Sequence, residues 1–462
     1  MPNEFDLIVI GSGPGGYVAA IRGAQLGMKT ACVERGCLGG TCLNVGCIPS
    51  KAMLDGSHRL AELSRYAKRG IKVEGVSLDL PAMMAFKDDV VKKSSDGVAY
   101  LFKKNKIETL RGQGRIVGPG KVEVKSGAAG QVYSARNILI ATGSEASQIP
   151  SLPFDGKFVL SSTEALALKE VPRKLIVVGA GYIGVELGSV WSRLGSEVLV
   201  LEFLEGILPP SDREMANALQ KMLEKQGLKF RFKTTAESVQ VAENKVKLTW
   251  KSGGESGVEE ADKVLVAVGR RPITDGLGLA EAGVALDKRG FVIVDEHFAT
   301  TAPGVWAIGD VIGGFMLAHK AEEEGIAAAE NMAGKAGHVN YAACPAVVYT
   351  HPELAAVGLT EEQARARGAV KIGKFPFLAN GRARGMDEIE GFVKVIGDAQ
   401  SDRLLGVHIL GTHASDVIAE ATLAMEFAAS VEDIALAFHA HPTLPEALKE
   451  AALAAENRVI NI

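Results

Sequence analysis

The hydrophobic pattern of the chain begins with an apolar run that enters a glycine-rich loop. Residues 5–10 (FDLIVI) predict a strand, the next six residues are GSGPGG, and a helix pattern follows through Leu26. A second apolar strand, residues 30–33, ends at Glu34. A strand, a glycine-rich turn, a helix and a second strand in this order predict a dinucleotide-binding unit.

Each glycine of this loop has a physical role in such a unit. Gly11 makes the tight turn, Gly13 lets the backbone approach a pyrophosphate, and Gly16 permits close helix packing. The start of the helix offers unpaired amides to the phosphate. The carboxylate of Glu34 is placed to accept a hydrogen bond from a ribose hydroxyl.

The same pattern returns later in the chain. Residues 174–178 (KLIVV) lead into GAGYIG, and the strand over residues 197–201 ends at Glu202. The first glycine and the acid are 23 positions apart in both copies, from 11 to 34 and from 179 to 202. Two such units predict two dinucleotides, or one FAD and one NAD(P).

The acid of the second copy also bears on the choice of nucleotide. Glu202 would repel the additional phosphate of NADP, and no arginine occurs in residues 203–210. NAD is therefore the preferred second dinucleotide.

The segments between and after the loops support duplication of a whole domain. Residues 54–106 predict long amphipathic helices, and residues 107–132 predict short strands with glycine turns. The apolar strand and turn at residues 137–143 (NILIATG) are echoed at residues 263–269 (KVLVAVG).

A further apolar strand ends at an acid in residues 304–310 (GVWAIGD). Two interpretations of Asp310 are open. Its carboxylate either holds a ribitol hydroxyl at the nucleotide crevice or caps a helix.

The pattern changes at about residue 346, where strands alternate with helices rich in alanine and leucine. The predicted strands cover residues 346–349, 391–396 and 404–409. No third glycine-rich loop occurs, so this region is expected to be a separate α+β domain.

The C-terminal region also contains the run HAHPTLPE, residues 439–446. Thr443 and Glu446 fit a capping box that opens a helix through Ala455. His441 is then only a surface residue before a helix. The alternative is that His441 is a catalytic base.

Composition and charge exclude several classes of protein. A length of 462 residues indicates about three domains, and the 47% hydrophobic and 23% charged residues are ordinary for a globular protein. The net charge of −4 argues against a nucleic-acid partner. No apolar run approaches the roughly 20 residues of a membrane span, and no signal peptide precedes the first strand. We therefore expect a cytoplasmic protein.

The run GGTCLNVGCIPSK, residues 39–51, contains two of the five cysteines. Clustered cysteines in a cytoplasmic protein are more often catalytic than structural. An undistorted helix would hold the alpha carbons of Cys42 and Cys47 at roughly 8–9 Å, beyond the limit of about 7 Å for a disulfide. A disulfide therefore requires a break in the helix, for which Gly46 supplies backbone freedom and Pro49 removes a donor. The other three cysteines, Cys32, Cys37 and Cys344, have no assigned chemistry.

These motifs together resemble the flavoprotein disulfide reductases over essentially the whole chain. The resemblance rests on both glycine loops, the cysteine run, ATGS at 141–144, GRRP at 269–272, AIGD at 307–310 and HAHPTLPE. It implies an α/β protein with two Rossmann-like domains and a C-terminal α+β dimerisation domain that makes a homodimer. The implied parts are an FAD domain (1–147), an NAD domain (148–273), a central segment that returns to the FAD domain (274–345) and the interface domain (346–462).

The resemblance also implies roles for the cysteine run. Cys42 corresponds to the thiol that exchanges with substrate, and Cys47 to the thiol that lies against the flavin. Lys51 corresponds to a lysine near the reactive edge of the flavin, and Glu186 to its ion-pair partner.

In this family the catalytic base comes from the interface domain. His441 corresponds to that base, Glu446 to the residue that orients it, and the base reaches the cysteines of the partner subunit.

The implied cofactor contacts are numerous, and no metal site is implied. For FAD they are Gly11, Gly13, Gly16, Glu34, Lys51, Gly114, Thr142, Gly143, Ser144, Asp310, Met316, Leu317, Ala318 and His319. For NAD they are Gly179, Gly181, Gly184, Glu186, Glu202, Val239 and Gly269.

The likeness is strongest to family members that oxidise protein-bound dihydrolipoyl groups. Electrons would pass from the dithiol to Cys42 and Cys47, then to FAD and NAD. The implied partners are the lipoyl domains of 2-oxoacid dehydrogenase acyltransferases or the carrier protein of glycine cleavage, and the sequence does not choose between them.

Relatives with other substrates fit less well. Mercuric reductases and large thioredoxin reductases carry a C-terminal cysteine pair, whereas no cysteine follows Cys344. Glutathione reductase would show basic residues near Glu202, and soluble transhydrogenases generally lack the full pair. A nucleotide-binding scaffold without turnover is the alternative from another class, and the set of Cys42, Cys47 and His441 argues against it.

Overall fold

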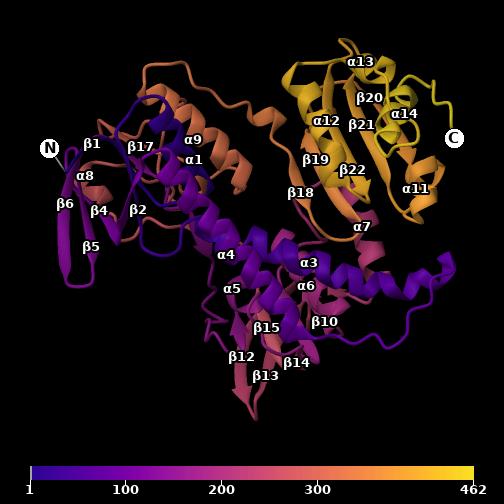
Figure 1. The fold of residues 1–462 in the computed structure, drawn as a ribbon. Coiled ribbons are helices and arrows are strands. Elements are labelled where there is room, and N and C mark those ends of the chain that lie inside the picture. The colour runs from indigo at the N-terminus through magenta and orange to yellow at the C-terminus, as the bar shows by residue number, and fades with distance from the viewer. Residues whose placement is uncertain (1–2) are drawn as a thin grey trace. The chain divides into compact units, whose positions relative to one another are not determined.

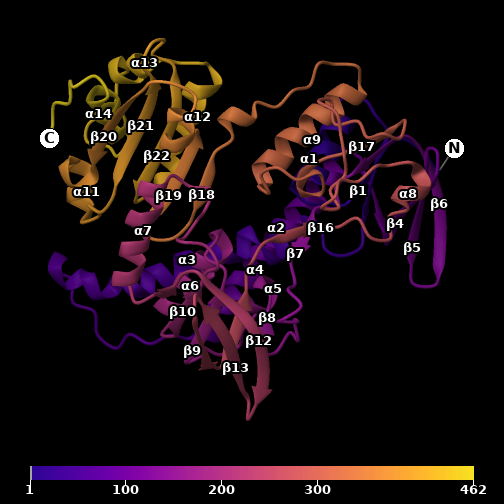
Figure 2. The same ribbon diagram turned by 180° about the vertical axis from the view of Figure 1, so that it is seen from behind.

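The computed structural model describes residues 3–462, which form two compact units (Figures 1 and 2). The first unit contains the residues up to Met53 together with Asp79–Ser147 and Gly269–Val339. The second contains Leu54–Leu78, Gln148–Val268 and Asn340–Ile462. The division into four parts made from the sequence stays a prediction.

A seven-stranded sheet forms the centre of the first unit. Its strands are β1 (Glu4–Ile10), β2 (Thr30–Glu34), β3 (Glu108–Arg111), β4 (Gln113–Gly118), β5 (Lys121–Ser126), β6 (Ala129–Ile140) and β17 (Val305–Ala307). The order is β3-β2-β1-β6-β5-β4, with β17 beside β6. β1 pairs in parallel with both β2 and β6. The strands predicted around the first glycine loop are confirmed.

Apolar clusters bury this sheet on both faces. Ile8 and Ile10 of β1 belong to one cluster, whereas Leu7 and Val9 belong to another. Successive side chains of a strand point to opposite faces, so an unbroken apolar run suits a sheet covered on both sides.

The helices of the first unit surround this sheet. They are α1 (Pro14–Gln25), α2 (Gly40–Val45), the start of α3 (Cys47–Glu62), α4 (Leu80–Lys104), α8 (Leu279–Ala282), η2 (Gly309–Ile312) and α9 (Ala318–Met332). A separate two-stranded sheet pairs β7 (Ser144–Ala146) with β16 (Arg270–Pro272). α1 and α9 lie side by side in both views (Figures 1 and 2). With η1 (Leu63–Arg69) of the second unit, α3 and α4 confirm the predicted helices, and residues 70–79 between η1 and α4 are not helical.

The second unit contains the second nucleotide fold as a parallel sheet of order β11-β10-β9-β15-β8. These strands are β8 (Val159–Leu160), β9 (Lys174–Val178), β10 (Glu197–Leu201), β11 (Lys229–Arg231) and β15 (Lys263–Val266). The accompanying helices and antiparallel strands are α5 (Ser162–Ala165), α6 (Tyr182–Arg193), α7 (Arg213–Lys225), β12 (Thr234–Ala242), β13 (Lys245–Ser252) and β14 (Glu255–Ala261). The bounds of β9 and β10 equal those predicted from the sequence.

A five-stranded antiparallel sheet forms the C-terminal part of the second unit, with the order β18-β19-β22-β21-β20. The strands are β18 (Ala346–Val348), β19 (Glu353–Gly358), β20 (Val370–Pro376), β21 (Phe392–Asp398) and β22 (Leu404–Gly411). The helices are α10 (Glu361–Arg365), α11 (Gly381–Met386), α12 (Ala414–Glu426), α13 (Val431–Leu436) and α14 (Glu446–Ala454), with 3-10 turns η3 (Tyr341–Ala343) and η4 (Phe377–Ala379).

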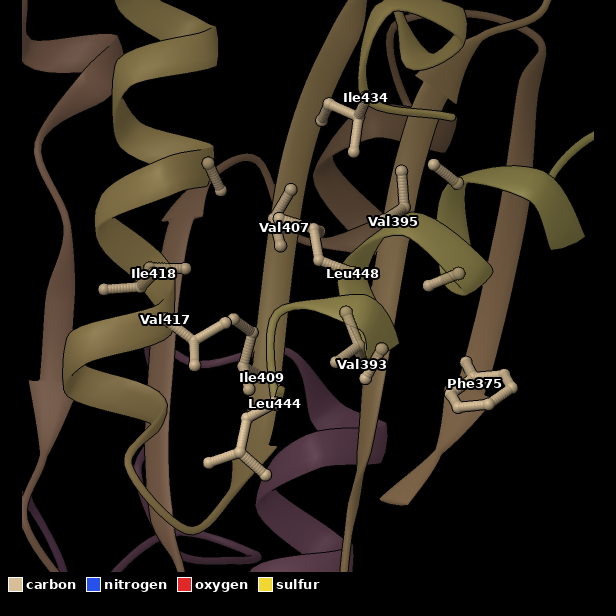
Figure 3. Close-up of a cluster of buried hydrophobic side chains, with 14 of the residues drawn as sticks. Phe375, Val393, Val395, Val407, Ile409, Val417, Ile418, Ile434, Leu444 and Leu448 are labelled. Carbon is tan, nitrogen blue, oxygen red and sulfur yellow. The ribbon is translucent and has the colours of Figure 1, made fainter. Parts of the chain in front are cut away.

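One apolar core joins this sheet to three of its helices (Figure 3). Val395 of β21 and Val407 of β22 lie beside side chains from α13 and α14, while Val417 and Ile418 of α12 complete the cluster. The core therefore fixes α12, α13 and α14 relative to one another.

Two strands of this region were not predicted. The alanines of β19 and the lysines and glycine of β20 give weak strand signals, and β19 pairs with β22 as well as with its neighbour β18. The capping box expected at Thr443 is only half formed, by the Thr443 amide that donates to Glu446 Oε2 at 2.7 Å. α14 begins at Glu446 after Pro445, without a side-chain cap, and the Thr443 hydroxyl donates to the carbonyl oxygen of Ala440 at 2.7 Å.

The two nucleotide loops share one steric constraint. A Cβ on Gly16 would collide with the carbonyl oxygen of Gly11, and a Cβ on Gly184 would collide with that of Gly179. Gly11 and Gly179 have φ values of 103° and 105°, in the left-handed region that favours glycine. Both helices therefore pack directly on the turn that precedes them.

We expect Gly184→Ala to destabilise the second nucleotide fold by about 1–3 kcal/mol, because the added methyl group overpacks the contact with Gly179. The measurement is the thermal unfolding midpoint of the full-length protein without NAD. Gly181→Ala is the matched control, because no atom lies within 4 Å of its Cβ position. Equal midpoints for both variants would contradict the steric argument.

Candidate active site

The helix break predicted between the two cysteines is present. Cys42 lies on α2, Cys47 is the first residue of α3, and Gly46 between them has φ −136° and ψ −112°. A Cβ at position 46 would come within 2.9 Å of the carbonyl oxygen of Thr41. Glycine therefore permits the close return of the chain that brings the cysteines together.

The two cysteine side chains are hydrogen-bonded to each other. This bond, followed by burial, raises the pKa of the Cys42 thiol above its usual range. A hydrogen bond raises the pKa of the group that donates it. The hydrogen bond with Cys47 and burial therefore both disfavour the thiolate form of Cys42 in the dithiol arrangement.

The cysteine helix is attached to the first nucleotide loop. The Gly39 amide donates to the carbonyl oxygen of Ser12 at 3.0 Å, and the Ser12 hydroxyl donates to Glu34 Oε2 at 2.6 Å. A Cβ on Gly40 would meet the alpha carbon of Gly13 at 2.6 Å. The start of α2 is therefore held against the glycine loop.

The first loop fits a dinucleotide. Gly13 is the N-cap of α1, where no side chain caps the helix and no atom lies within 4 Å of the missing Cβ. The free amides and the open glycine suit the phosphates of FAD.

The acids that end the second strands make contacts that the sequence did not reveal. Glu34 accepts from the Ser12 amide at 3.0 Å and from the Gly36 amide at 2.7 Å. Glu202 repeats this pattern with the amides of Ala180 at 2.7 Å and Leu204 at 2.8 Å. A carboxylate has about four acceptor positions, so each can still accept from a ribose.

Asp310 does not cap a helix through its side chain. Ile308 precedes η2 without a side-chain cap, and the Asp310 carboxylate accepts from the Ser144 hydroxyl at 2.5 Å. Arg270 donates to the same hydroxyl oxygen at 2.7 Å and to the Ser144 carbonyl at 2.6 Å. The motif GRRP contained Arg270, but only Gly269 was singled out from it.

The remaining residues expected at FAD occupy several positions of the first unit. Lys51 is on α3, the Thr142 hydroxyl donates to the Ile273 carbonyl at 2.7 Å, and Gly143 has φ 72°. Met316 and Leu317 directly precede α9, which contains Ala318 and His319. A Cβ on Gly114 of β4 would press on Ile10 at 3.0 Å.

The residues expected at NAD occupy the second unit with one exception. Gly181 is the uncapped N-cap of α6. Glu186 on that helix is buried and accepts from the Tyr349 amide at 3.0 Å. Val239 is in β12 opposite Leu248, whereas Gly269 is counted with the first unit. The ion pair between Lys51 and Glu186 stays a prediction.

The predicted catalytic histidine and its acid are in contact. His441 Nδ1 is 2.8 Å from Glu446 Oε1, and the Thr443 amide donates to Oε2 at 2.7 Å. Burial opposes ionisation of Glu446, but these two hydrogen bonds outweigh it and lower its pKa. Donation from Nδ1 to an ionised carboxylate leaves the lone pair on Nε2. His441 is thus oriented to accept a proton.

A second histidine in the same run was missed. His439 Nε2 is 2.7 Å from Glu420 Oε1. The sequence could have drawn attention to His439 only through its position two residues before His441. Its partner acid, Glu420, lies 19 residues upstream, so spacing alone does not link the two.

Within residues 3–462, no group of three or more His, Cys, Asp and Glu residues is arranged to hold a metal ion. Among the same residues, no helix has the length and apolar character required to cross a membrane.

Two dinucleotide folds, a cysteine pair attached to the first of them and a separate C-terminal sheet define a nucleotide-dependent thiol–disulfide oxidoreductase. The chain belongs to the pyridine nucleotide-disulphide oxidoreductase family, whose model matches residues 5–325. The dimerisation domain of that family matches residues 344–452. The protein is therefore an FAD- and NAD-dependent oxidoreductase, and its dimerisation domain supports a homodimer.

Similar curated proteins cover the whole chain. Dihydrolipoyl dehydrogenase 1, mitochondrial, from Arabidopsis thaliana is 53% identical over all of this chain and 92% of its own length. Dihydrolipoyl dehydrogenase from Cupriavidus necator is 48% identical over the full length of both proteins. Leghemoglobin reductase from Glycine max is 52% identical over 98% of this chain and 88% of its own.

Solved structures share the fold. LpdA from Mycobacterium tuberculosis matches with a TM-score of 0.91 and 26% identity, over 96% of this chain and 98% of its own. The flavoprotein disulfide reductase RclA from Escherichia coli, as a Cu(II) complex, matches with a TM-score of 0.87 and 28% identity, over 97% of this chain and 99% of its own.

Proposed function

We propose that the protein is a dihydrolipoamide dehydrogenase, which oxidises protein-bound dihydrolipoyl groups to lipoyl groups and reduces NAD⁺ to NADH. The hydrogen-bonded pair of Cys42 and Cys47, attached to the first nucleotide loop, carries this proposal. The relatives named dihydrolipoyl dehydrogenase, at about 50% identity over the whole chain, support the choice of substrate.

The reaction follows from thiol chemistry. His441 takes the proton from a dihydrolipoyl thiol, and the thiolate attacks the Cys42 sulfur of the Cys42–Cys47 disulfide. The Cys42–Cys47 bond breaks, a mixed disulfide forms, and Cys47 leaves as the thiolate. The second lipoyl thiol, as its thiolate, then attacks the lipoyl sulfur bonded to Cys42, which releases the oxidised lipoyl group and Cys42. When bound at the first nucleotide loop, FAD would supply the two-electron chemistry that couples reoxidation of the Cys42 and Cys47 dithiol to hydride reduction of NAD⁺.

The structure of this chain supports the assigned roles of three residues. Glu446 holds His441 by Nδ1, so that Nε2 can accept the proton. The Cys42 side chain is hydrogen-bonded to that of Cys47, the sulfur that faces the flavin in this proposal, so the two sulfurs are placed for exchange. His441 acts on the cysteines of the partner subunit.

We also propose the FAD and NAD contacts expected from the sequence, including the ion pair of Lys51 with Glu186. The uncapped starts of α1 and α6 support the two phosphate sites.

The proposed partners are the lipoyl domains of 2-oxoacid dehydrogenase acyltransferases or the glycine cleavage carrier. A cytoplasmic location stays a prediction, while the Arabidopsis and Dictyostelium relatives carry the word mitochondrial in their names.

The purified, FAD-loaded protein should reduce NAD⁺ with dihydrolipoamide far faster than with glutathione, and should prefer NAD⁺ to NADP⁺. The measurement is the appearance of NADH or NADPH at saturating concentrations of each thiol. Faster turnover with glutathione, or no turnover with dihydrolipoamide, would overturn the proposed substrate.

Replacing Cys42 with serine should lower dihydrolipoamide turnover by roughly a thousandfold or more, because the exchange thiol is lost. The visible flavin spectrum should remain. Cys37→Ser is the matched control, since Cys37 is exposed and lies five positions upstream. NAD-linked activity that survives in Cys42→Ser would contradict the mechanism.

Glu202→Ala should raise the KM for NAD⁺ by roughly tenfold or more, because a hydrogen bond to a charged group contributes about 1.5–3 kcal/mol. Its preference for NAD⁺ over NADP⁺ should decrease as well. Glu205→Ala is the control, because Glu205 is exposed and pairs with the surface residue Lys233. An unchanged KM in Glu202→Ala would place the ribose elsewhere.

A further inference from the structure

The two histidines of the run HAHP have opposite environments. The His439 side chain is 5% exposed in the chain, whereas the His441 side chain is 79% exposed. Each histidine contacts a carboxylate, Glu420 and Glu446 respectively. The proposed mechanism uses only His441, so the buried histidine requires its own explanation.

Both ring nitrogens of His439 face hydrogen-bond acceptors. Nδ1 is 3.1 Å from the carbonyl oxygen of Ala437, and Nε2 is 2.7 Å from Glu420 Oε1. A neutral imidazole has one N–H and could satisfy only one of these acceptors, whereas an imidazolium donates to both. The geometry therefore favours the protonated form of His439, which joins its own loop to α12 through both ring nitrogens.

Further contacts hold the same loop, residues 437–445. Lys449 Nζ of α14 also donates to the Ala437 carbonyl at 2.8 Å. Asn380 Nδ2 donates to the Thr443 carbonyl at 2.9 Å. Leu444 is buried in the core beside Ile409 and Val417 (Figure 3). Glu420 is on α12, as Val417 is, so the core holds both sides of the His439–Glu420 contact in place.

We propose that His439, as an imidazolium held between Glu420 and Ala437, is a positioning residue that fixes the backbone from which His441 projects. This inference rests on the proposed function, because it assigns His441 as the base in lipoyl oxidation. His439 does not touch the substrate or the cofactor in this proposal. It acts through the contacts of its ring with Glu420 and with the Ala437 carbonyl, which hold the backbone that leads to His441.

The charges around His439 favour its protonated form. The hydrogen bond to Glu420 raises the pKa of His439, and burial and the Lys449 ammonium oppose this increase. Glu446 adds a second carboxylate nearby. The protonated form donates to both Glu420 and the Ala437 carbonyl. Both hydrogen bonds are therefore present below the pKa of His439, and one is lost as the pH rises through it.

The test compares His439→Gln, Glu420→Ala and the double variant with the wild-type holoenzyme. Turnover of dihydrolipoamide with NAD⁺ is measured across pH, and NADH oxidation by ferricyanide reports flavin chemistry that needs no thiol exchange. The control is Asp416→Ala, because Asp416 is an exposed acid of the same helix that faces His413 at 3.4 Å.

Each single variant should lower the kcat for dihydrolipoamide by roughly tenfold at neutral pH, because a small displacement of a catalytic group costs this much or more. Ferricyanide reduction, FAD content and the thermal midpoint should stay near wild type. The double variant should be no slower than either single variant, since the two residues act as a unit. The ratio of wild-type to His439→Gln turnover should approach one as the pH rises.

Four results would overturn the inference alone while the wild type oxidises dihydrolipoamide. They are unchanged turnover in His439→Gln, an equal loss of ferricyanide reduction, a turnover ratio that is constant with pH, and additive losses in the double variant. A wild-type holoenzyme that does not oxidise dihydrolipoamide would instead overturn the proposed function, and the inference with it.

Discussion

The carboxylate of Glu34 is the contact on which the arrangement of the first unit depends. It accepts from the amide and the hydroxyl of Ser12, and Ser12 in turn accepts from the Gly39 amide at the start of the cysteine helix. One ionised group at the end of β2 thus fixes the nucleotide loop and the element that carries Cys42. Because a charged acceptor makes stronger hydrogen bonds than a neutral one, the loop and the thiol are positioned together.

The second nucleotide fold repeats this arrangement without a cysteine pair. Glu202 orients its own loop through the Ala180 amide, as Glu34 does through Ser12. The residue after the first loop glycine is alanine in the second copy and serine in the first. In both copies the backbone carbonyl of this residue accepts from a later amide, that of Gly39 in the first copy and that of Leu208 in the second. The Ser12 hydroxyl adds a further contact between Glu34 and the Gly39 amide.

Features encoded by local spacing were predictable from the sequence. The glycine loops, the bounds of β9 and β10 and the break at Gly46 each follow from neighbouring residues. Features that depend on distant partners were not predictable, such as the pairing of β19 with β22, which lies some 50 residues later. The contact of His439 with Glu420 is of the same kind. For the capping box, local spacing predicted one of the two bonds: Glu446 accepts from the Thr443 amide, whereas the Thr443 hydroxyl donates to the Ala440 carbonyl and Glu446 also binds His441.

The two histidine–acid pairs show how an exposed base can be held accurately. A side chain that must reach another molecule cannot also be packed in its own core, so its orientation has to come from its backbone and from one anchored ring nitrogen. Glu446 supplies the anchor, and the buried contacts of the loop supply the backbone. An imidazolium suits the holding of the loop backbone because its one small ring can donate to two acceptors. In the proposed mechanism one histidine of the run accepts a proton and the other holds the loop, and the acceptors that each ring contacts determine these two roles.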